Sequence, residues 1–266
     1  MTYRVEEPLG IITLNRPERR NAINSDMISR LHSALDEALD NEDIHAVFVS
    51  GEGSAFSAGV DLREAAGNYG RSHDDLVASG DTMARLFRRL RSYEKVTIAG
   101  VNGPALGSGC GLAVLCDFTL ATGSARFGYP EVRYGFVPAL VSVYLRGMVN
   151  EKRFRDLLLT GRVLSAEEAF EYGLVSKVVP QGGLLECGME IGRIIGENAP
   201  AAIQMTKELL ETLPGLDVDK ALKAAVDYDA RMRGSADCHK GIEAFLNKTA
   251  PDWRVEPPAE EDQASE

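Results

Sequence analysis

The chain has 266 residues, 44% of them hydrophobic and 26% charged, which is enough for one large or two small domains with a sizeable core. Its net charge of −11 disfavours nucleic acid and anionic membranes as partners, because both require a basic face. Its apolar runs are too short to span a bilayer, and the first ten residues lack the features of a signal peptide, so a cytoplasmic location is expected.

Cysteine and histidine usage argues against several kinds of site. The four cysteines form no CxxC pair and predict buried thiols rather than a disulfide framework or a zinc site. The four histidines lie outside every motif described below. A Ser-His-Asp or Cys-His mechanism therefore has little support.

The first part of the chain predicts an α/β pattern. Residues 10–14 and 44–50 are predicted strands, and apolar residues at helical spacing predict a helix over 25–39 with Asn24 or Ser25 as its cap. Polar residues 63–82 predict either a mobile segment or a frayed helix, and 83–90 predict a helix. Strand, helix and strand in this order are typical of an α/β fold.

The stretch from Val96 to Asp117 begins with a predicted buried strand over 96–101. A glycine-rich turn, 106–111, then enters a short apolar helix that ends near 115. Such a turn leaves backbone N–H groups without helix carbonyl partners, which favours an anion or oxyanion site. Glycines at a strand–helix junction are also explained by close packing alone.

The second half changes from mixed structure to helices. Strands are predicted at 118–121 and 174–179, with strand and turn character over 127–137. Helices are predicted at 138–148, 151–160 and, from a capping box at Ser165, 165–172. After that only helices follow, at 184–198, 200–212, 217–233 and 236–247. We therefore expect an α/β domain over 1–195, a helical domain over 196–250, and a disordered acidic tail over 251–266.

Several segments, in this order, resemble the enoyl-CoA hydratase/isomerase (crotonase) superfamily. They are Asn15-Arg16-Pro17 with Asn21-Ala22, AFSAGVD at 55–61, VNGPALGSGCGLAVLCD at 101–117, FGYPEV at 127–132 and LTGRVLSAEEAFEYGLVSKVV at 159–179. The resemblance covers about residues 3 to 250. It implies a crotonase-like spiral of ββα turns with a helical C-terminal domain, assembled as a homotrimer or homohexamer. It also implies an acyl-CoA thioester substrate with no metal or redox cofactor, coenzyme A entering as part of the substrate.

The chemistry shared by this superfamily is stabilisation of a thioester enolate. By position in the motifs, the backbone N–H groups of Val60 and Ser108 resemble the two donors that hold the enolate oxygen. Glu131 resembles the catalytic acid/base. From the residues alone, a carboxylate in an apolar run is solvated, paired or functional, and the motif favours the functional interpretation.

The resemblance also proposes contacts with coenzyme A. Arg20 and Arg63 stand where they could meet its phosphates, although solvated loop arginines remain the alternative. Phe245 and Lys248 match a C-terminal segment that closes the coenzyme A site in related enzymes, although Phe245 could equally be a core residue. Four residues would cradle the adenine and pantetheine through their backbone: Ala22, Ala58, Asp61 and Leu62.

One departure from the pattern leaves the reaction open. Typical hydratases carry a second glutamate where this chain has Gly111, whereas isomerases of the superfamily work with the single glutamate. Hydration and double-bond isomerisation therefore both remain, with Tyr129, Tyr134 or Glu64 as candidate second groups. Other lyase or hydrolase chemistry on a CoA ester is a third possibility. A catalytically silent acyl-CoA-binding or RNA-binding scaffold is disfavoured by the acidic charge and by Glu131.

Overall fold

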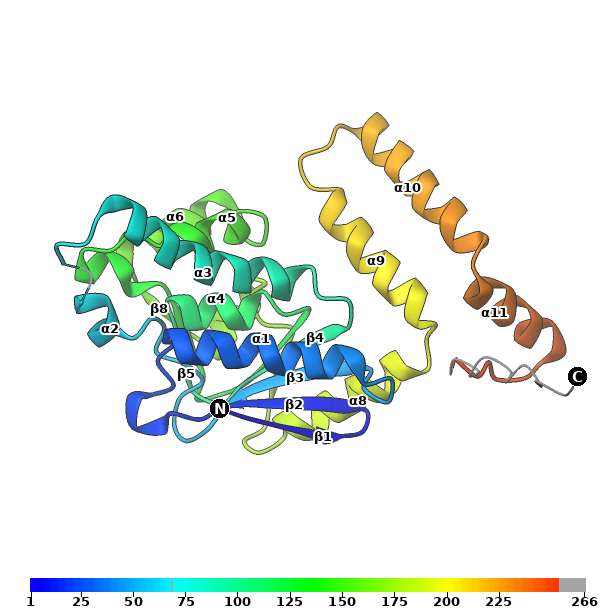
Figure 1. Cartoon of the computed structure of the whole chain (residues 1–266), viewed down its shortest axis with the longest axis horizontal. Coiled ribbons are helices and arrows are strands. Elements are labelled where there is room, and N and C mark those ends of the chain that lie inside the picture. Colours follow the sequence, from blue (N-terminus) through cyan, green and yellow to red (C-terminus); the bar gives the residue numbers. More distant parts are fainter. Residues whose placement is uncertain (68, 254–266) are drawn as a thin grey trace, which may run out of the picture. The chain divides into compact units, whose positions relative to one another are not determined.

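The computed structural model describes residues 1–67 and 69–253 of the chain (Figure 1). The chain divides into two compact units, Met1–Gly196 and Glu197–Glu266. From residue 254 onward, the tail predicted at 251–266 lies outside the described residues.

The first unit is built on a six-stranded sheet with the order β1-β2-β3-β4-β6-β9. Its edge strand β1 pairs antiparallel with β2, and every other neighbouring pair is parallel. Parallel strands are usually covered on both faces, which explains why all six residues of β4 are buried. The strands are β1 (Thr2–Glu6), β2 (Leu9–Leu14), β3 (Ala46–Gly51), β4 (Val96–Val101), β6 (Phe118–Thr122) and β9 (Lys177–Val179).

A second sheet contains β5 (Pro104–Leu106), β7 (Arg126–Gly128) and β8 (Val163–Ser165). The chain alternates between the two sheets: β4 leads into β5, then helix α4 (Ser108–Val114) follows, then β6 leads into β7. Because β4 pairs with β6 and β5 pairs with β7, both in parallel, each strand–strand–helix turn stacks on the next. The predicted spiral of ββα turns is thus confirmed.

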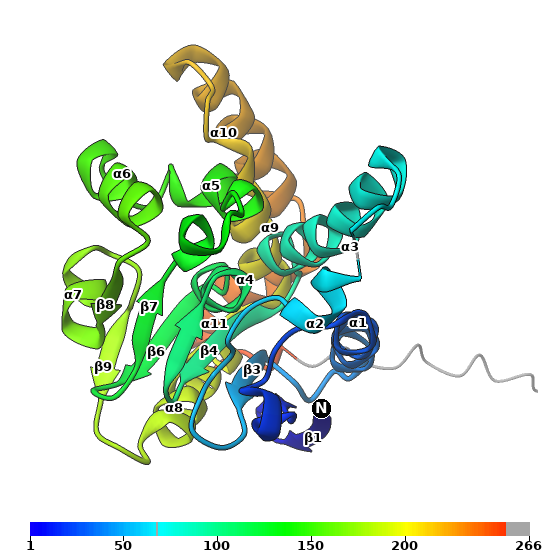
Figure 2. The same cartoon turned by 90° about the vertical axis from the view of Figure 1, so that its left-hand side faces the viewer.

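Helices cover both faces of the six-stranded sheet. On one side lie α1 (Ser25–Asp40), α3 (His73–Arg91) and α4, and α3 contacts both other helices. On the opposite side α8 (Leu184–Gly196) packs against β2, β3, β4 and β6 (Figure 2). The buried side chains between these layers form the main core, with Phe56, Phe87 and Phe127 among its largest members.

The remaining elements of the first unit are short. They are the 3₁₀ helices η1 (Pro17–Arg19) and η2 (Pro130–Tyr134) and the α-helices α2 (Leu62–Ala66), α5 (Ala139–Leu145), α6 (Glu151–Thr160) and α7 (Ala166–Glu171). The capping box predicted at Ser165 is present, because its side chain accepts from Glu168 N–H and the Glu168 carboxylate accepts from Ser165 N–H.

The polar segment before residue 83 is largely helical, which was one of the two alternatives expected for it. Helix α3 begins at His73, ten residues before the predicted start at 83, and the Ser72 hydroxyl accepts a hydrogen bond from Asp75 N–H. Sequence periodicity missed this start because the first turns of α3 are exposed on every side and so carry no apolar stripe.

As far as residue 253, the second unit contains three helices, α9 (Pro200–Thr212), α10 (Val218–Arg233) and α11 (Ala236–Asn247), which pack against one another. The side chains of Asp217 and Ser235 cap α10 and α11. Several large apolar side chains of these helices are exposed, namely Leu210, Leu222, Val226, Phe245 and Leu246.

Candidate active site

The two motif segments that precede Val60 and Ser108 run side by side. Ser57 forms a parallel bridge with Ala105, and Ala105 is in turn paired in register with Phe127 of β7. Val60 lies three residues after Ser57, and Ser108 lies three residues after Ala105. Glu131 lies four residues after Phe127. The spiral thus brings three segments, the first and last of which are 71 residues apart at Val60 and Glu131, to the same edge of the second sheet.

The backbone N–H groups of Val60 and Ser108 are available as donors. Among the described residues, neither donates a hydrogen bond to another protein group. The adjacent amide of Asp61 does, donating to Ile23 O at 2.9 Å. Ser108 is the first residue of α4, where a helix N–H has no internal acceptor and the helix dipole favours negative charge. The two N–H groups therefore form a candidate oxyanion hole.

Close backbone packing sets the separation of these donors. A methyl group at Gly59, which has a φ of +90°, would lie 2.7 Å from Leu106 O and 3.4 Å from Ser108 N. Gly109 packs equally closely, since a Cβ there would lie 2.6 Å from Ser57 O. Only glycine allows the two segments to approach this far. The positive φ is carried by Gly107, at +53°, so Ser108 itself keeps an ordinary helical backbone.

Glu131 lies directly beside this pair of loops. A Cβ at Gly107 would be 3.1 Å from Oε1 of Glu131, which places the carboxylate next to the residue that precedes Ser108. Its Oε2 is buried and has no hydrogen-bond partner among the described residues. Burial raises the pKa of Glu131 above its usual range. A carboxylate that gains a proton more readily is suited to general acid–base catalysis near neutral pH.

These groups open into one cavity of about 690 Å³, within the range of small-molecule sites. Val60, Ser108 and Glu131 line it, and so do Ala58 and Leu62. Most of its other walls are apolar and come from the start of α1, from α3 and from the segment that joins η2 to α5. A mainly apolar cavity that contains two free N–H groups and one carboxylate can bind an acyl chain and stabilise charge on its carbonyl oxygen.

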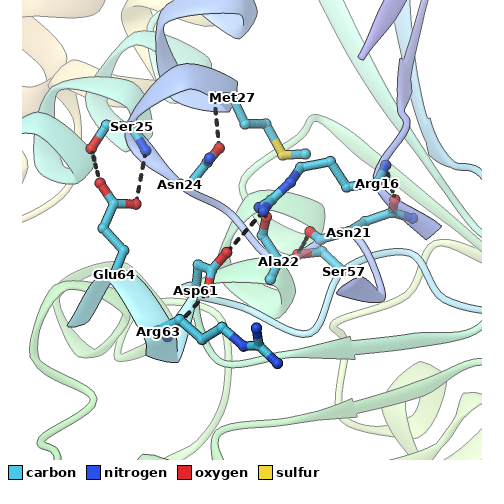
Figure 3. A network of polar contacts seen from close by, with 10 residues as sticks. All are labelled: Arg16, Asn21, Ala22, Asn24, Ser25, Met27, Ser57, Asp61, Arg63 and Glu64. Atoms are coloured by element: carbon cyan, nitrogen blue, oxygen red, sulfur yellow. Dashed lines mark hydrogen bonds and ion pairs between the residues drawn. The ribbon is translucent and has the colours of Figure 1, made fainter. Parts of the chain in front are cut away.

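A polar network holds the loop that carries Val60 (Figure 3). The Arg16 guanidinium donates to Asp61 Oδ2 at 3.0 Å and to Ala22 O at 2.6 Å. Asp61 in turn caps α2 by accepting from Arg63 N–H. Burial by itself raises the pKa of Asp61, but the hydrogen bonds and charge of Arg16 outweigh it and lower that pKa. The Asp61 carboxylate is thus ionised and fixes the residue adjacent to Val60.

Asn21 completes this network from inside the protein. It is fully buried with a φ of +54°, and its side chain accepts from Arg16 N–H and donates to Glu52 O and Ala55 O. Ser57 Oγ donates to Asn21 O, which ties this loop to the segment beneath Val60. The sequence motif contained both Arg16 and Asn21, but nothing in it indicated which carboxylate Arg16 pairs with.

Of the residues predicted to bind coenzyme A, only Ala58 and Leu62 line the cavity. The N–H groups of Ala58 and Asp61 already donate to Arg20 O and Ile23 O. A ligand would therefore contact Ala58 and Asp61 through atoms other than their backbone nitrogens. Arg20, Ala22, Asp61 and Arg63 do not line the cavity. Arg20 and Arg63 are exposed, and Figure 3 shows the Arg63 side chain directed away from Asp61. Phe245, 81% exposed, and Lys248, the C-cap of α11, belong to the second unit.

Gly111 is enclosed by apolar side chains. It lies within α4, and a Cβ there would be 2.8 Å from both Phe87 Cζ and Val141 Cγ1. The space into which a second carboxylate would extend is therefore already occupied. Asp117, which follows this helix, accepts from Thr97 N–H and Thr97 Oγ1 and so ties the end of α4 to β4.

Other kinds of centre find no support among the described residues. Cys110 is fully buried, and its burial raises the pKa of the thiol to about 12, so it stays protonated. Within residues 1–67 and 69–253, no three His, Cys, Asp or Glu side chains gather as metal ligands would. In the same part of the chain, every helix is too short or too polar to cross a bilayer.

Comparison with known proteins identifies the family of this chain. The family model for enoyl-CoA hydratase/isomerase matches residues 4–256. A Thermus thermophilus protein named as an inferred enoyl-CoA hydratase is 40% identical, with 91% of this chain and 96% of that protein covered. The 2,3-dehydroadipyl-CoA hydratase of Escherichia coli is 34% identical, with 92% and 94% covered. The crystal structure of an enoyl-CoA hydratase from Polaromonas superposes with a TM-score of 0.89 at 29% identity, with 95% and 99% covered.

The fold and the site define an acyl-CoA-processing enzyme. The chain belongs to the enoyl-CoA hydratase/isomerase family.

Proposed function

We propose that this enzyme hydrates or isomerises an enoyl-CoA thioester, with Val60 and Ser108 N–H as oxyanion donors and Glu131 as the acid/base. The observation that carries this proposal is the position of the Glu131 carboxylate beside Gly107, within the cavity that both donors line. Each preorganised donor aimed at a developing oxyanion contributes about 3 kcal/mol to catalysis.

In the proposed isomerisation, Glu131 takes a proton from C2 of a 3-enoyl thioester. The C2–H electron pair becomes part of a dienolate, whose charge on the thioester oxygen is held by the two N–H groups. Glu131 then returns the proton at C4, and the double bond moves to C2–C3. The cycle uses one carboxylate and two amides, with coenzyme A as part of the substrate, and requires no metal or redox cofactor.

The coenzyme A half of the substrate is proposed to bind at the exposed loops beside the cavity. Arg20 and Arg63 would meet its phosphates, and the backbone around Ala58 and Leu62 would hold the pantetheine. Phe245 and Lys248 are proposed to close the site, and the exposed apolar side chains of α9–α11 are proposed to pack between copies in a homotrimer or homohexamer.

The test uses two thioesters of matched chain length. Hydration of trans-2-hexenoyl-CoA removes the enoyl absorbance, and isomerisation of trans-3-hexenoyl-CoA creates it. Glu131→Gln should lower both rates at least ~100-fold while CoA-ester binding, measured by calorimetry, persists, because the change removes the proton carrier and keeps its volume. Full activity in this variant would remove Glu131 from the mechanism.

A further inference from the structure

The space beside Gly111, where other hydratases carry their second glutamate, is filled by apolar side chains. Phe87 and Val141 fill that space, so a side chain at position 111 has no room to extend toward the substrate. A hydratase must nevertheless hold a water molecule in line with the alkene, and one carboxylate gives that water a single partner. Any second partner has to come from elsewhere on the cavity wall.

Two of the three candidate groups are unsuitable. Glu64 lines the cavity, but its carboxylate accepts from both the N–H and the hydroxyl of Ser25, at the start of α1. Tyr129 precedes Glu131 by two residues, yet it is completely buried and does not line the cavity. Neither group is free to meet water beside the substrate.

Tyr134 has the required placement. It lines the cavity, and the residue is 64% exposed. Glu131 and Tyr134 are three residues apart on η2, and in a 3₁₀ helix such side chains project from the same side. The turn that fixes this geometry is closed by Phe136 N–H, which donates to Glu131 O at 3.0 Å. Tyr134 thus shares one side of η2 with Glu131, whose Oε2 has no partner among the described residues.

We propose that the Tyr134 hydroxyl is the second partner of the reacting water, in place of the carboxylate that other hydratases use. The proposal rests on the function proposed above and adds a residue to its hydration reaction. The water oxygen bonds to C3 while one of its protons passes to Glu131, and the C2=C3 electron pair moves into the enolate held by Val60 and Ser108. Glu131 then delivers that proton to C2. Tyr134 holds the water through a hydrogen bond and keeps its own proton.

This role predicts a selective defect, because isomerisation involves no water. Tyr134→Phe removes only the hydroxyl from an exposed side chain, so folding should be unchanged. We expect kcat for hydration of trans-2-hexenoyl-CoA to fall about 10-fold or more, the value of one lost hydrogen bond in the transition state. Loss of trans-3-hexenoyl-CoA, followed by chromatography, should stay within about twofold of the wild-type rate. Tyr144→Phe, which removes a hydroxyl from α5 outside the cavity, serves as the matched control.

The outcomes separate this proposal from the function on which it rests. Equal losses in both reactions would mean that Tyr134 only shapes the cavity, and unchanged hydration would mean that it does not hold the water. A wild-type enzyme that isomerises but never hydrates would also overturn the role of Tyr134 and leave that of Glu131 standing. A wild-type enzyme inactive on both esters would instead refute the proposed function.

Discussion

Gly59→Ala tests whether the spacing of the two N–H donors matters for catalysis. An ideal Cβ at Gly59 would lie 2.7 Å from Leu106 O, whereas ordinary contacts begin at 3.4 Å, so the segments of Val60 and Ser108 must separate by about 0.7 Å. Leu106 O is a backbone atom of a paired strand and cannot rotate away as the end of a side chain could. The movement therefore falls on the donors themselves.

The expected size of the effect follows from this displacement. Loss of one oxyanion-hole donor costs about 10²–10³ in kcat, and displacements near 1 Å cost about 10². We expect kcat/KM of Gly59→Ala to fall about 100-fold. The free energy of unfolding should fall by about 2–5 kcal/mol, from a left-handed alanine at about 1–2 kcal/mol and overpacking at about 1–3 kcal/mol.

Gly182→Ala is the matched control for this experiment. Gly182 has a φ of +89°, close to the +90° of Gly59, but a Cβ there would contact nothing within 4 Å. Gly182→Ala therefore places an alanine in a left-handed backbone conformation without a steric clash. This variant should have a lower free energy of unfolding but an unchanged kcat/KM. The assays are urea unfolding and steady-state kinetics on enoyl-CoA. A folded Gly59→Ala enzyme with kcat/KM within about threefold of Gly182→Ala would refute the view that these loops set the donor geometry.

Three further predictions concern charge. Arg16→Met should lower the free energy of unfolding by about 1–3 kcal/mol, because it leaves the largely buried Asp61 carboxylate unpaired. That loss of stability should shrink as the pH falls below about 4 and Asp61 is protonated. As a control, Arg30→Met at an exposed ion pair should cost less than about 0.5 kcal/mol in urea unfolding. Because burial raises the pKa of Glu131, kcat/KM should fall with decreasing pH, with a midpoint above pH 4.5. For the same reason Glu131→Gln should be more stable than wild type at pH 8, where the buried carboxylate is charged, but not below pH 4. A variant that is less stable than wild type at pH 8 would contradict the burial argument. Arg20→Ala and Arg63→Ala should weaken binding of CoA esters more than of pantetheine esters, and equal losses in calorimetry would exclude phosphate contacts.

Local backbone patterns in the sequence indicated where N–H groups would be free. A glycine-rich turn that enters a helix leaves such groups without helix acceptors, the resemblance then proposed Ser108 as the donor, and Ser108 N–H has no acceptor among the described residues. Glu131 stood out as a carboxylate in an apolar segment. The ββα spiral itself came from the resemblance, since the strands of the second sheet are only three residues long and carry no clear alternation.

The sequence could not predict contacts between distant segments. Arg16 and Asp61 are 45 residues apart, and several arginines near the start of the chain were equally plausible partners. Likewise, Gly111 indicated that a carboxylate is missing but not what replaces it, because Phe87 comes from α3 and Val141 from α5. Such pairings depend on how the helices pack on the sheet, which local patterns do not encode.

The structure also explains why the departure at Gly111 is compatible with an active enzyme. A glutamate there would have to displace Phe87 or Val141, both in the core, and would place a charge among apolar side chains. The apolar filling of that space and the exposed tyrosine on η2 are therefore complementary features. The first leaves no room for a polar side chain at position 111, and the second is proposed to supply a hydroxyl on the Glu131 side. On this proposal the enzyme needs no carboxylate at 111 to hold water, and Gly111→Glu alone should reduce stability without raising hydration.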